Sequence, residues 1–111
     1  MIKNITNILS KKGYIFSTFV AITPKQLGSR KQLNIYSGCD LNNHFISVFV
    51  VDQKSRFLVK NAMDLIILQN KLVDLEQHNF KTNILVISST ICSKAVDFLI
   101  KNGWKIYNDI V

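Results

Sequence analysis

Three charged residues of the sequence have the chemistry of a site that acts on phosphodiesters. Asp40 follows a glycine and a cysteine, whereas Asp52 and Lys54 form an Asp-x-Lys segment after an apolar run. Two carboxylates can hold a divalent cation beside a phosphate, and an ammonium group can offset charge that develops on it. The apolar run between the acids is expected to be a strand that brings them together. Each part also has a plain structural reading, as a turn acid and a polar loop.

The apolar patterns predict the elements that must position these residues. Leucines at helical spacing favour a long helix over 61–79, and the unbroken run Ile84–Ile87 is typical of an inner strand buried on both faces. A serine or threonine at 89–90 is expected to cap a second helix, which Gly103 ends. The remaining elements are a helix over 2–11 and strands over 14–22, 32–37, 45–54 and 104–107. The order is helix, three strands, helix, strand, helix, strand, which predicts an α/β fold.

Size and charge narrow the class of protein. At 111 residues, we expect one domain over 1–111, and the net charge of +7 favours an anionic partner. The first 39 residues hold six basic residues and no acidic one. Nucleic acid is the natural ligand of such a surface. Candidate phosphate contacts are Lys25, Arg30 and Lys31 in a basic loop and Arg56 beyond Asp52, although each is also compatible with a solvated surface.

The remaining composition points to a cytoplasmic protein that does not enter membranes. Cys39 and Cys92 have the spacing of neither a metal knuckle nor a redox pair, so we expect reduced thiols in a cytoplasm. The apolar stretch over 13–22 is too short to cross a bilayer and contains hydroxyl residues.

This arrangement resembles the PD-(D/E)xK nuclease superfamily, in particular the Mrr-type restriction endonuclease domains. Gly38-Cys39-Asp40-Leu41 is similar to the family's Gly-x-Asp second strand, and Val50-Val51-Asp52-Gln53-Lys54 to its apolar run before (Asp/Glu/Gln)-x-Lys. The segments around 84–95 and 103–109 resemble the family's later strand, helix and closing strand. The sequence departs from the family in two places. Many members have a glutamate in the first helix, but no glutamate precedes Asp40 here, and Cys39 stands where many members have proline.

The resemblance implies a restriction-endonuclease-like domain of three layers, with a central mixed β-sheet flanked by helices. It also implies Mg²⁺- or Mn²⁺-dependent cleavage of DNA, with Asp40 and Asp52 as metal ligands and Lys54 as the third catalytic residue. A chain of this size would need to form a homodimer to cut both strands of a duplex. Two alternatives are a nucleic-acid-binding module on the same fold without catalysis, and an adaptor that binds proteins.

Overall fold

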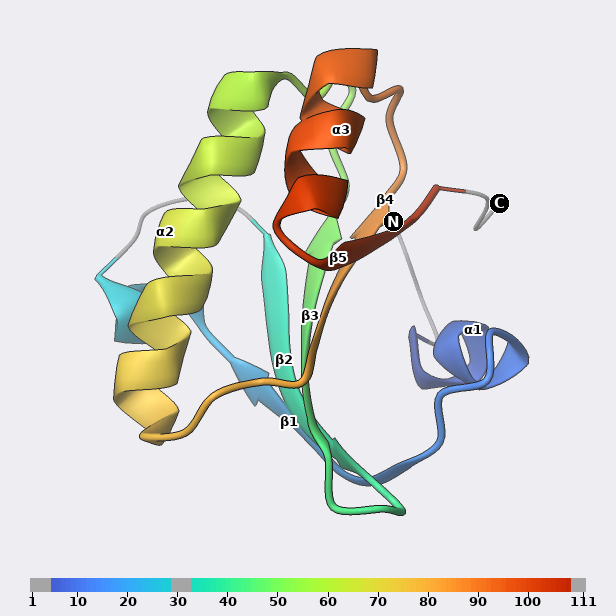
Figure 1. The fold of residues 1–111 in the computed structure, drawn as a ribbon, viewed down its shortest axis with the longest axis vertical. Helices are drawn as coiled ribbons and strands as arrows, with labels where there is room; N and C mark the ends of the chain where they lie inside the picture. The colour runs from blue at the N-terminus through green and yellow to red at the C-terminus, as the bar shows by residue number, and fades with distance from the viewer. Residues whose placement is uncertain (1–4, 29–32, 109–111) are drawn as a thin grey trace.

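The computed structural model describes residues 5–28 and 33–108, and it confirms the predicted order of elements (Figure 1). None of the helices in these two ranges is both long and apolar enough to cross a membrane. The elements in chain order are α1 (Ile5–Lys11), β1 (Phe16–Ile22), a 3₁₀ turn η1 (Pro24–Leu27), β2 (Asn34–Asp40), β3 (Phe45–Val51), α2 (Val59–Glu76), β4 (Thr82–Ile87), α3 (Ser93–Lys101) and β5 (Trp104–Tyr107).

The five strands form one mixed sheet in the order β1-β2-β3-β4-β5. β1, β2 and β3 are joined as antiparallel neighbours, whereas β4 and β5 run parallel to β3. The helices α2 and α3 cover one face of the sheet and α1 lies against the other (Figure 1). The predicted α/β class and its three layers are therefore confirmed.

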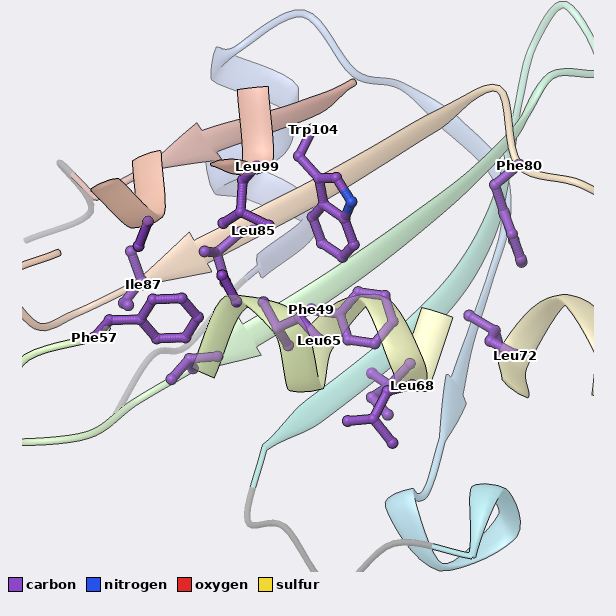
Figure 2. Packing of buried hydrophobic residues seen from close by; sticks show 14 of the residues in the cluster. Phe49, Phe57, Leu65, Leu68, Leu72, Phe80, Leu85, Ile87, Leu99 and Trp104 are labelled. Carbon is purple, nitrogen blue, oxygen red and sulfur yellow. The ribbon is translucent and has the colours of Figure 1, made fainter. Parts of the chain in front are cut away.

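The alternation of side chains along β3 divides the core between the two faces. Val48 and Val50 point to the face that carries α1, and Phe49 and Val51 point to the face that carries α2 and α3. All four are almost fully buried because β3 lies in the middle of the sheet. On the α2 side, the Phe49 ring packs against Trp104 with ring centroids 5.3 Å apart (Figure 2).

Both long helices begin differently from the prediction. α2 starts two residues before the expected cap, and the Asn61 side chain accepts a hydrogen bond from the Leu58 backbone N–H (2.9 Å). In α3 the cap is Cys92, whose Sγ accepts from the Ala95 N–H (3.3 Å), so the expected serine or threonine cap is wrong. The reason lies in the preceding loops: the Phe57 N–H donates to the Thr90 carbonyl (2.9 Å) and holds that segment extended.

Two strand boundaries also differ from the prediction. β2 continues through Gly38, which was expected to end it, because the missing side chain leaves room for Phe16. A Cβ atom at Gly38 would lie 2.7 Å from the Phe16 ring. β3 ends at Val51, three residues before Lys54, so strand alternation does not place Asp52 and Lys54 on one face.

Tyr14, which follows α1, contacts the edge strand β5 through its hydroxyl group, and this contact can be tested by spectroscopy. Its hydroxyl lies 3.0 Å from that of Tyr107, and burial together with this hydrogen bond raises the pKa of Tyr14 to about 12. The raised pKa favours the neutral phenol in the folded state, so its stabilising effect is complete below pH 10 and is lost as the pH rises through 12. In an ultraviolet titration we expect Tyr107→Phe to lower the highest tyrosine pKa, which is that of Tyr14. An unchanged highest pKa would contradict the pairing.

Candidate functional site

The sheet has two edges of different character, set by the direction of its strands. β3, β4 and β5 all end at one edge, which we call the carboxyl edge and define by the loops and first helical turns at 52–60 and 88–94. The β2–β3 hairpin turn lies at the opposite edge (Figure 1). In mixed sheets, ligands commonly bind outside the carboxyl ends of parallel strands.

Asp40 is the last residue of β2, where it stabilises the following hairpin turn. Its Oδ1 accepts hydrogen bonds from the backbone N–H groups of Asn42 and His44, both at 2.9 Å. Its Oδ2 lies 3.5 Å from Nδ1 of His44. The N–H of His44, then that of Asn42 and the nearby imidazole, lower the pKa of Asp40 below its usual value. The turn-acid reading of Asp40 therefore accounts for its contacts.

The structure does not bring Asp40 and Asp52 together. Cys39 pairs with Phe45 at the start of β3, whereas Asp52 follows the last residue of that strand. About eight residues of extended chain separate the two positions, which corresponds to roughly 25 Å. The two carboxylates cannot hold one ion in this arrangement, because antiparallel pairing places a residue just before the hairpin turn far from one after the second strand.

The turn contacts of Asp40 predict a pH-dependent stabilisation. Asp40→Ala removes the acceptor for two backbone N–H groups, so we expect a lower melting temperature at pH 7, while Asp40→Asn retains an acceptor and loses less. Since the folded pKa is lowered, the carboxylate's contribution is present above the unfolded pKa and disappears as the pH falls through the folded one. Thermal unfolding of the three proteins from pH 2 to 7 measures this. Equal melting temperatures at pH 7 would contradict the assignment.

Asp52 occupies the carboxyl edge and is held from the neighbouring strand. The hydroxyl of Ser88, which directly follows β4, donates to Asp52 Oδ1 at 2.8 Å. Lys54 lies in the exposed bend two residues further along. Gln53 instead lines a cavity of about 200 Å³ beneath the start of α2, on the other face of the sheet. Asp52 and Lys54 are therefore near each other in the chain and accessible from solvent.

In the described segments 52–60 and 88–94, Asp52 is the only carboxylate, so they do not supply the second ligand of a two-carboxylate metal site. Among the described residues, no group of three or more His, Cys, Asp or Glu could hold an ion. At this end of β2 the described strand begins with Asn34, which lies opposite Val50 and carries an amide rather than a carboxylate. Mg²⁺ sites usually rely on one or two carboxylates together with substrate oxygens. No catalytic step through a metal follows from this arrangement.

Exposed cations gather around the carboxyl edge. The segments 52–60 and 88–94 contain four basic residues and one acidic residue, Asp52. All four basic side chains are exposed, and they come from one loop and two helices. They are Lys54 and Arg56 after β3, Lys60 in α2 and Lys94 in α3.

The structure describes one of the other three predicted phosphate contacts. Lys25 is exposed in η1, which follows the end of β1 and packs against α2. Arg30 and Lys31 fall outside the described residues. Of the two predicted nucleic-acid contacts that the structure describes, Arg56 lies in the same loop as Asp52 and Lys54.

Both helices that start at the carboxyl edge carry a lysine where a helix disfavours one. Lys60 is the second residue of α2 and Lys94 the second of α3, and neither first turn contains an acid. The N-terminal end of a helix carries partial positive charge, so a cation there costs about 0.3–1 kcal/mol. Two such lysines beside Lys54 and Arg56 concentrate positive potential on one edge. That is the electrostatic arrangement of an anion-binding surface.

The sequence alone did not assign these residues to the site. For Lys60, an extension of the groove and a solvated helix entry were equally plausible, Lys94 had no assigned role, and Ser88 looked like part of a helix cap. The signal that could have identified the lysines is their position in first turns that lack acids. The bond from Ser88 to Asp52 depends on the parallel pairing of β3 with β4, in which Val51 lies beside Ile87.

Neither a family model nor a curated protein matches the sequence. Solved structures do match. EndoMS in its apo form superposes on 93% of this chain with a TM-score of 0.57 and 13% identity, and an EndoMS–dsDNA complex on 92% with 0.54 and 16%. A repair endonuclease from Pyrococcus abyssi covers 83% of the chain, with a TM-score of 0.52 and 14% identity.

The fold is restriction-endonuclease-like. These matches cover 45%, 41% and 38% of the solved chains, so this chain spans less than half of each. At such low identity the likeness establishes the fold, and any activity must be argued from this chain's own residues.

Proposed function

We propose that this chain binds DNA through the carboxyl edge of its sheet and does not cut it. The observation that carries the proposal is the set of four exposed cations around one acid, contributed by one loop and two helix starts. A phosphate backbone neutralises such a set and releases counterions, which favours binding. One structural neighbour is a complex with double-stranded DNA, which supports DNA as the polyanion.

The proposal also accounts for the lysines at the helix starts. A phosphate placed before α2 or α3 would be attracted by the partial positive charge of the helix and by the nearby lysine together. The same lysine is unfavourable in the free protein. Bound phosphate therefore offsets a cost that the protein carries when unbound.

Metal-dependent cleavage of DNA is the second candidate, favoured by the place of Asp52 at the end of β3 and of Lys54 two residues later. A nuclease of the Mrr type that acts in restriction, repair or junction processing would use this edge with Mg²⁺ or Mn²⁺. The separation of Asp40 from Asp52 favours binding over cleavage. On either reading we expect a cytoplasmic protein and a homodimer.

One experiment separates the two candidates. Supercoiled, branched and single-stranded DNA are incubated with wild type and with Asp52→Ala, with Mg²⁺, Mn²⁺ or EDTA, and both binding and strand cleavage are measured. We expect salt-sensitive binding by both proteins and intact DNA throughout. Metal-dependent cleavage that Asp52→Ala and Lys54→Ala abolish would replace the proposal with the nuclease. No binding at low salt would overturn both candidates.

A further inference from the structure

The two edge strands of the sheet differ in how well they are protected from pairing with another chain. β5 has four residues and includes Lys105. Short length and a lysine are the features by which natural edge strands avoid association. β1 has seven residues, Phe-Ser-Thr-Phe-Val-Ala-Ile, with neither charge nor proline. In the part of the chain that the structure describes, β1 pairs only with β2, so its outer edge has unpaired backbone groups.

The regular part of β1 exposes a large apolar side chain on that open edge. The register with β2 shifts between Phe16 and Thr18, after which the pairing is regular to the end of the strand. Val20 lies in the centre of this regular part and is 56% exposed. Its side chain points to the same face as Ile22, which is buried in the core under α2. Val20 thus extends that core beyond the area that the helices cover.

We propose that β1 pairs antiparallel with β1 of a second copy of this chain, about a two-fold axis at Val20. In this register Thr18 lies opposite Ile22, Phe19 opposite Ala21, and each Val20 opposite the other. A β-branched pair in direct opposition stabilises an antiparallel ladder. The two-fold arrangement is closed, so it produces a dimer and not a fibre.

The distribution of charge favours association of two copies at β1 rather than at other parts of the protein surface. A chain with a net charge of +7 repels its copies, and contact is least costly where the surface has no charge. Lys25 follows β1 in η1 and Ile15 precedes it, so both lie outside the proposed ladder. No lysine faces a lysine across the joined strands.

The geometry of this dimer does not allow both carboxyl edges to close on one DNA duplex. A two-fold axis that pairs two strands antiparallel is perpendicular to the sheet, so the carboxyl edges of the two copies point in opposite directions. On the proposed function, each dimer then presents two binding edges to two separate DNA segments. The dimer itself depends only on β1 and stands whether or not the carboxyl edge binds DNA.

Sedimentation equilibrium tests the pairing with matched variants. Val20→Lys places a charge at the centre of the ladder, and Ile100→Lys makes the same change at a similarly exposed position (58%) on α3. We expect wild type and Ile100→Lys to be dimers at tens of micromolar, and Val20→Lys to be a monomer with an unchanged circular dichroism spectrum and retained DNA affinity. A monomeric wild type, a dimeric Val20→Lys, or equal dissociation by both variants would overturn the proposal.

A cysteine at the axis tests the register without disrupting the strand. In a background with Cys39→Ser and Cys92→Ser, Val20→Cys brings two thiols into direct opposition, whereas Ser17→Cys places them apart. We expect mild oxidation to link Val20→Cys into a covalent dimer several-fold faster than Ser17→Cys. Equal rates would contradict the two-fold register.

Discussion

The double variant Lys60→Ala/Lys94→Ala should bind duplex DNA on the order of 30-fold more weakly than wild type at 0.15 M salt. Each phosphate contact contributes a slope of about −0.9 to the dependence of log K on log salt, which corresponds to about fivefold in affinity at that concentration. The slope should therefore become less steep by about 1.8 in the double variant. Adding Lys54→Ala and Arg56→Ala should raise the total loss to on the order of 10³. Fluorescence anisotropy between 0.05 and 0.3 M salt measures both quantities.

The matched control removes the same charge from the opposite edge of the sheet. Lys81 precedes β4 beside the hairpin, and Lys101 ends α3 at that edge, and both are exposed. Lys81→Ala/Lys101→Ala should change affinity much less than Lys60→Ala/Lys94→Ala. Equal losses would mean that net charge, rather than the carboxyl edge, governs binding. Because a lysine is unfavourable at the start of a helix, Lys60→Ala/Lys94→Ala should also be at least as stable as wild type.

Phe49→Ala should lower the free energy of unfolding by about 3–5 kcal/mol, the largest stability effect that we expect from one substitution. Phe49 is fully buried in the central strand and packs on Trp104 between the sheet and the helices (Figure 2). Removal of the ring leaves a cavity that β3 and β4 cannot close, because both are paired on either side. For a domain of this size, total stability is about 5–15 kcal/mol, so much of it would be lost.

Urea unfolding followed by circular dichroism measures the effect, and the same strand provides the control. Phe45 begins β3 and is 39% exposed, with its ring stacked on His78. Phe45→Ala should cost clearly less than Phe49→Ala, because less apolar area leaves water on folding. A similar loss for both substitutions would contradict the burial of Phe49 in the core cluster between the sheet and α2.

The order of elements could be predicted because each one has a local signal. The run Ile84–Ile87 has no polar interruption, and it became the doubly paired strand β4. Boundaries were less accurate where tertiary contacts decide them. Gly38 looked like a strand end, and only the position of the Phe16 ring explains why the strand passes through it.

The candidate site was predicted in part, because proximity in a sheet depends on strand direction. Asp52 and Lys54 are two residues apart along the chain, so their shared edge follows from the end of one strand. Whether Asp40 lies near Asp52 depends on the register of β2 and β3, which cannot be read from the sequence spacing. In the structure, a tight hairpin turn places Asp40 at the other end of β3. Ser88 could be recognised as the partner of Asp52 only after β3 and β4 were known to be parallel neighbours.

The most direct measurement of the central claim is the map of amide chemical shifts when a short DNA duplex is added to ¹⁵N-labelled protein. We expect the largest chemical-shift changes at the carboxyl edge, in residues 52–60 and 88–94, and no change in the hairpin at 40–45. Changes centred on the hairpin, or no changes at low salt, would contradict the claim.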